Sequence, residues 1–71
     1  MHVLTAKDAK NISKELCPDS TKLYKYYVRV ANTFEAAMEL TYIANTLQWN
    51  IDRVRLVRHG LVSEGYLVKQ G

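Results

Sequence analysis

Few side chains in this sequence have the type and spacing that metal binding requires. The single cysteine, Cys17, precedes Pro18, and the two histidines, His2 and His59, lie far apart in the chain. A zinc site needs several Cys and His residues at short, defined spacings. We therefore expect no metal site and no cofactor.

The candidates for nucleophilic and acid–base chemistry are equally isolated. Cys17 is expected at the carboxyl end of a helix, where the dipole disfavours a thiolate, so we interpret it as a small buried hydrophobic residue. The acidic pairs Asp8/Glu15 and Glu35/Glu39 fit solvated helix faces, whereas acid–base catalysis needs a cleft that shifts carboxyl pKa values. None of the three glycines belongs to a phosphate-binding motif. We expect no catalytic residues, no enzyme activity and no small-molecule substrate.

Length and composition indicate one small globular domain over residues 1–71. The chain is 48% hydrophobic and 24% charged, which is ordinary for a folded protein. It has no apolar run of the roughly eighteen residues that a membrane helix needs. The first residues lack the pattern of an export signal, and a single cysteine suits a reducing compartment, so we expect a cytoplasmic location. The net charge of +3 is compatible with nucleic acid but does not identify it.

Periodicity predicts five main elements. A helix is expected over 5–17, ended by Pro18, and a second over 33–48, with Thr33 as its N-cap. Strands are expected over 21–31 and 51–58, because both segments alternate and the first is rich in Tyr and Val. A last strand contains Tyr66, Leu67 and Val68. Either His59-Gly60 or residues 63–65 make the turn before it.

The expected fold is therefore α+β in the order helix, strand, helix, strand, strand. The helix between the first two strands favours a right-handed crossover between parallel strands. We expect a three-stranded sheet with two helices on one face. A short extra strand at residues 1–4 is compatible with the sequence.

The predicted sheet offers one candidate binding surface. Alternation places Lys25, Tyr27 and Arg29 on one face of the strand 21–31, with Lys22 nearby, and Arg53 and Arg55 on one face of the strand 51–58. In such an arrangement the cations can neutralise phosphates, and the aromatic ring can stack on a base. A solvated face whose Lys and Arg residues blunt the sheet edges is the alternative interpretation.

The outer strip of the helix 33–48 is the second candidate surface. Its apolar core stripe is accompanied by a second strip on the other side, consisting of Phe34, Met38 and Tyr42, with Trp49 just beyond. Aromatic and Met side chains are typical of protein interfaces. Either the first helix covers this strip through Ala9, Ile12 and Leu16, or a protein partner or a second copy does.

Two functional hypotheses follow. The first is a non-catalytic protein-interaction module, most simply a homodimer, that regulates or inhibits a macromolecular partner. The alternative is a nucleic-acid-binding module that uses the basic sheet face. Charge is also divided along the chain, because the predicted strands are basic whereas the segment 33–48 contains Glu35 and Glu39 and no Lys or Arg.

Overall fold

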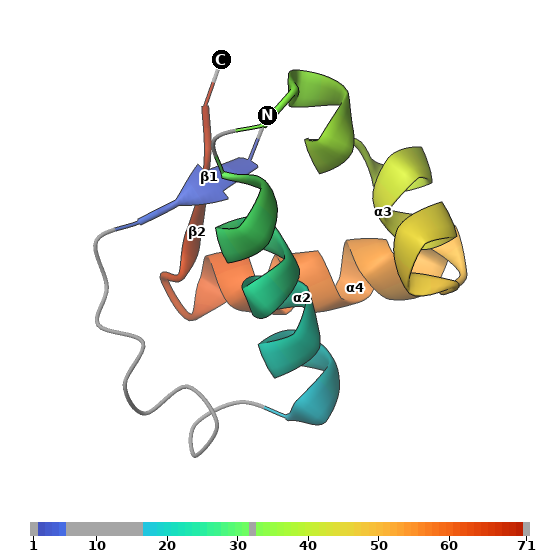
Figure 1. The fold of residues 1–71 in the computed structure, drawn as a ribbon. Coiled ribbons are helices and arrows are strands. Elements are labelled where there is room, and N and C mark those ends of the chain that lie inside the picture. Colours follow the sequence, from blue (N-terminus) through green and yellow to red (C-terminus); the bar gives the residue numbers. More distant parts are fainter. Residues whose placement is uncertain (1, 6–16, 32, 71) are drawn as a thin grey trace.

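The computed structural model describes residues 2–5, 17–31 and 33–70. In this part of the chain, three α-helices and a short 3₁₀ helix lie between two short strands. Figure 1 shows the helices packed against one another, with the two strands side by side at one end. The described chain is mixed α and β but mostly helical, so the prediction of a three-stranded sheet with two helices on one face is wrong.

The segment predicted as the strand 21–31 forms the helix α2, Pro18–Val30. Pro18 and Asp19 lie in its first turn, where both residue types are favoured. Its buried apolar residues follow the helical spacing of three and four: Leu23, Tyr26, Tyr27 and Val30. Burial of this stripe outweighs the strand preference of Tyr and Val, which depends on packing context.

The helix predicted over 33–48 is interrupted. It consists of the 3₁₀ helix η1, Glu35–Met38, and the α-helix α3, Leu40–Leu47. Glu39 lies between them with an extended backbone (φ −81°, ψ 147°). Thr33 does not cap this segment. Its hydroxyl donates to the Val30 carbonyl at 2.8 Å and so gives a hydrogen-bond partner to the last carbonyl of α2.

The segment predicted as the strand 51–58 is the first part of the helix α4, Ile51–Ser63. Asn50 caps this helix: its side chain accepts a hydrogen bond from the backbone N–H of Asp52 at 2.7 Å. Val54 and Leu61 are buried on the inner side of α4. Gly60 lies inside the helix, so it does not form the turn.

The chain leaves α4 through the second of the two predicted turns. Gly65 has φ 84°, and the N–H groups of Gly65 and Tyr66 donate to the carbonyls of Val62 and Leu61 at 3.0 and 2.9 Å. This pair of bonds is a Schellman cap. The predicted last strand is present as β2, Leu67–Lys69, and the extra strand as β1, His2–Leu4, but they pair antiparallel with each other. The helix predicted over 5–17 lies almost wholly outside the described residues.

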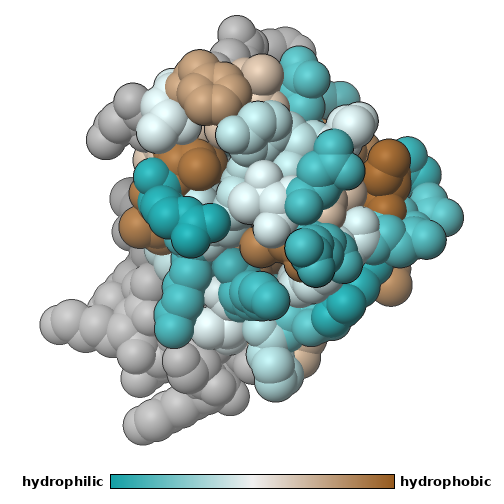
Figure 2. Space-filling model, turned by 45° about the vertical axis from the view of Figure 1, so that its right-hand side comes forward, coloured by the Kyte–Doolittle hydropathy of each residue, from teal (hydrophilic) through white to brown (hydrophobic). Residues whose placement is uncertain are grey.

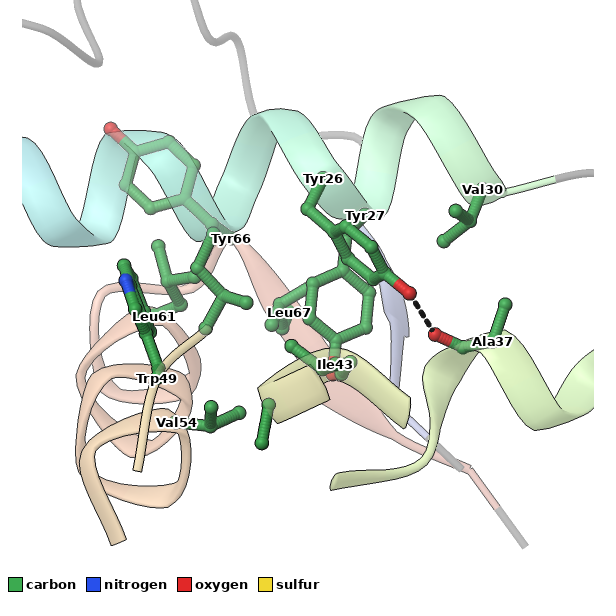
Figure 3. Close-up of a cluster of buried hydrophobic side chains, with 12 residues drawn as sticks. Tyr26, Tyr27, Val30, Ala37, Ile43, Trp49, Val54, Leu61, Tyr66 and Leu67 are labelled. Carbon is green, nitrogen blue, oxygen red and sulfur yellow. Dashed lines mark hydrogen bonds between the residues drawn. The ribbon is translucent and has the colours of Figure 1, made fainter. Parts of the chain in front are cut away.

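One cluster of buried side chains holds these elements together (Figure 3). Tyr26 projects from α2 toward Ala37 of η1, Tyr27 projects toward Ile43 of α3, and both tyrosines are almost fully buried. The Tyr26 hydroxyl donates to the carbonyl of Ala37 at 2.5 Å, which fixes η1 against α2. Trp49, Leu61 and Tyr66 fill the other end of the cluster.

The surface contains no single large apolar face in the view of Figure 2. Hydrophilic side chains cover the middle of this view, and hydrophobic ones lie in separate small patches. Within the described residues, no helix combines the length and the apolar character needed to cross a membrane.

The two glycines at and near the end of α4 should respond oppositely to substitution. A Cβ at Gly60 would meet no atom within 4 Å, so Gly60→Ala should stabilise the helix by about 0.5–1 kcal/mol. Gly65→Ala should destabilise the protein by about 1 kcal/mol, because its φ is positive. Urea unfolding followed by circular dichroism measures both, and an equal effect of the two substitutions would contradict this assignment.

Candidate nucleic-acid interface

The residues that could do chemistry lie apart from one another. Cys17 is exposed and precedes α2, so the prediction that it is buried is wrong, while the helix expected before it lies outside the described residues. The Ser20 hydroxyl lies 3.3 Å from its sulfur and lowers the pKa of the thiol. His2 lies on β1, where burial and the charge of Arg58 lower its pKa, and His59 is exposed on α4. Within residues 2–5, 17–31 and 33–70, no three His, Cys, Asp or Glu residues are grouped to hold a metal.

The predicted basic face around Tyr27 does not exist. Lys22, Lys25 and Arg29 share one side of α2, because they are separated by three and four residues in a helix. Tyr27 points the other way and is completely buried, so no base can stack on it. Burial raises the pKa of Tyr27, and the positive charge of the nearby Arg58 offsets part of this rise. We call Lys22, Lys25 and Arg29 the cationic ridge.

Arg53, which the sequence placed on the basic face, has a structural role. Its Nε and Nη2 donate to the two carboxylate oxygens of Asp19 at 3.1 and 2.6 Å. Its guanidinium also lies 4.2 Å from the ring centre of Trp49, and the Lys22 Nζ lies 6.0 Å from the same ring. Trp49 is therefore only 8% exposed, although the sequence placed it on an outer strip. We call Asp19, Arg53 and Trp49 the tryptophan clamp.

The rest of the predicted outer strip divides in the structure. Phe34 and Tyr42 are 56% and 41% exposed, and their rings meet edge to face with centres 5.3 Å apart. Met38 is half-buried and packs against the core. Ala9, Ile12 and Leu16, which were expected as an internal cover for this strip, lie outside the described residues.

The helices α3 and α4 are joined by a tight turn of residues 48–50. Gln48 adopts the left-handed conformation (φ 57°, ψ 42°), and the N–H of Trp49 donates to the carbonyl of Ala44 at 2.9 Å. Asn50 then starts α4 as its cap. In Figure 1, α3 crosses the amino-terminal end of α4 and does not run alongside it. A turn of three or four residues between two crossing helices is the type of connection found in helix-turn-helix units.

The outer side of α4 is free of contacts with the core. Asp52, Arg55, Leu56 and His59 are all exposed there, opposite Val54 and Leu61. Leu56 is 72% exposed, the largest value among the exposed large hydrophobic residues of the described chain. The Arg55 Nη1 lies 3.4 Å from Asp52, in a solvent-exposed pair that a ligand could replace at little cost.

This combination of side chains can recognise the edges of base pairs. An arginine can donate two hydrogen bonds to guanine, a carboxylate can accept from cytosine, and an apolar side chain can contact the methyl group of thymine. Of the predicted nucleic-acid residues, only Arg55 belongs to this side of α4. The sequence reasoning did not place Asp52 and Leu56 on a binding surface, although the cap residue Asn50 before Asp52 was a visible sign of a helix start.

Loss of the tryptophan clamp should be visible in the emission of Trp49, the only tryptophan. Arg53→Ala removes the guanidinium from the ring, so the emission should shift to longer wavelength and the unfolding midpoint should fall. Arg55→Ala, which removes the same charge from the exposed side of α4, should change neither. Identical spectra for Arg53→Ala and the unmodified protein would contradict the clamp.

Acid should open the same clamp. The hydrogen bond from Arg53 lowers the pKa of Asp19. Because the folded pKa lies below the unfolded one, the stabilisation is complete above the unfolded pKa and is lost as the pH falls through the folded pKa. The Trp49 emission should shift to longer wavelength over that step, and Asp19→Asn should abolish the pH dependence of this shift. A titration unaffected by Asp19→Asn would exclude Asp19 as its source.

Comparison with known proteins returned no relative. No family model matches the sequence, no curated protein is significantly similar to it, and no solved structure matches the fold.

Proposed function

We propose that this protein binds double-stranded DNA by inserting α4 into the major groove. The observation that carries the proposal is the exposed side of α4, with Asp52, Arg55, Leu56 and His59, presented by a capped turn that follows α3. In helix-turn-helix proteins the second helix enters the major groove, and residues near its amino end contact the bases. Asp52, Arg55 and Leu56 occupy the first two turns of α4.

Duplex DNA fits this helix better than other nucleic acids do. The major groove of B-form DNA admits an α-helix, whereas that of A-form RNA is too deep and narrow for side chains to read. Single strands are bound by stacking on several exposed aromatic faces, and the outer side of α4 has no Phe, Tyr or Trp among the residues described. The net charge of +3 would assist the approach to phosphates.

Nucleic-acid binding was the alternative predicted from the sequence, on a basic face around Tyr27. The proposed site lies instead on α4, and the ring of Tyr27 has no part in it. A binding function without catalysis, in the cytoplasm, agrees with the expectations from composition. The protein-interaction hypothesis stays as a second candidate, because Phe34 and Tyr42 form an exposed aromatic pair.

Selection from a random-sequence duplex library, followed by fluorescence anisotropy on an enriched duplex, tests the proposal. We expect binding that weakens steeply with salt. Arg55→Ala should lower the affinity about tenfold or more and relax the preference at one base pair, because a bidentate contact to guanine contributes about 1–3 kcal/mol.

Lys25→Ala is the matched control, since it removes one exposed positive charge from α2 instead of α4. This variant should retain the sequence preference and lose little affinity. No enrichment of any duplex at low salt, or an equal loss of affinity in the two variants, would overturn the proposal.

A further inference from the structure

The exposed pair of Phe34 and Tyr42 is held in place by the core. The backbone N–H of Ala37 donates to the Phe34 carbonyl at 3.1 Å, and the Ala37 carbonyl accepts the Tyr26 hydroxyl. Tyr42 lies in the first turn of α3, whose next residues, Ile43 and Ala44, are buried. Both rings therefore stand on a fixed support, and burying them against a partner would remove apolar surface from water at about 25 cal/mol per Å².

Opposite charges lie on the two elements that border this pair. On α2, the cationic ridge ends at Arg29, whose guanidinium lies 5.4 Å from the ring centre of Tyr26. Neither Lys25 nor Arg29 forms an ion pair with any described residue. On the other element, the segment 33–48 contains Glu35 and Glu39 and no Lys or Arg. Figure 1 shows η1 between the end of α2 and α3, so the basic and acidic elements are neighbours.

A surface with an apolar centre, a basic side and an acidic side is complementary to itself. A two-fold axis through the aromatic pair would place α2 of one copy against the segment 33–48 of the other. An acidic partner would be repelled by the exposed Glu39, and a basic one by Lys25 and Arg29. Single-stranded nucleic acid fits less well, because the two rings meet at 83° and offer no pair of parallel stacking faces.

We infer that the Phe34–Tyr42 surface binds a second copy of this chain, with Arg29 of each copy facing Glu39 of the other. Self-association would also offset the small core that a chain of this length can bury. The surface uses α2, η1 and α3 and leaves the outer side of α4 free. If the proposed DNA binding also holds, the two α4 helices would favour inverted half-sites, and this consequence alone rests on that function.

Sedimentation equilibrium of the full chain without DNA tests the inference. The unmodified protein should have the mass of a dimer, and the Phe34→Ser/Tyr42→Ser variant that of a folded monomer, with circular dichroism as the folding check. Leu56→Ser, which removes an exposed apolar residue from α4, should stay dimeric. A monomeric unmodified protein, or a dimer that Leu56→Ser disrupts and Phe34→Ser/Tyr42→Ser does not, would overturn it.

Charge reversal tests the orientation of the two copies. Arg29→Glu alone and Glu39→Arg alone should each be monomeric, because like charges then face each other across the axis. An equimolar mixture of the two variants should form a heterodimer, since both facing pairs again carry opposite charges. Failure of the mixture to associate would contradict the proposed interface. These measurements use no DNA, so they stand or fall independently of the proposed function.

Discussion

Packing of Trp49 between the first turns of α2 and α4 is the contact on which the arrangement of the helices depends. Trp49 lies in the turn that joins α3 to α4, and its backbone N–H donates to the Ala44 carbonyl. Arg53 covers its ring and pairs with Asp19. Trp49, with Arg53 and Asp19, thus connects the turn, α2 and α4. The direction in which α4 presents its outer side follows from this contact.

The exposed residues then divide into two surfaces with different chemistry. The outer side of α4 combines polar, charged and apolar side chains that suit the varied edges of base pairs. The surface around Phe34 and Tyr42 combines two aromatic rings with opposite charges on neighbouring elements. Because one surface lies on α4 and the other on α2, η1 and α3, a dimer contact and a DNA contact would be compatible.

The sequence predicted some of these features, and the reasons for its failures are physical. The sequence predicted a helix end near residue 48 and the last strand, and it allowed the strand at residues 1–4 and, as one of two alternatives, the turn at 63–65. The segment 21–31 fits two periods at once, because its Tyr and Val residues alternate while Leu23, Tyr26, Tyr27 and Val30 also follow the helical repeat. Only the tertiary burial of that stripe decides between them.

The candidate site was predictable to a smaller extent. In the segment 51–58, the alternation of Arg53, Val54 and Arg55 indicated a strand, and it hid the cap at Asn50. The exposure of Phe34 and Tyr42 agrees with their predicted place on an outer strip, whereas Trp49 is buried because Arg53 and Lys22 cover its ring. The Lys22–Trp49 contact and the Asp19–Arg53 pair that holds the guanidinium join residues about thirty positions apart, and no local pattern encodes them.

Nuclear magnetic resonance of the ¹⁵N-labelled protein tests most directly whether α4 reads duplex DNA. On titration with a pool of short duplexes, we expect the amide signals of Asp52, Arg55, Leu56 and His59 to move, while those of Lys25 and Arg29 move little. Shifts confined to the cationic ridge of α2, or an unchanged spectrum at low salt, would contradict it.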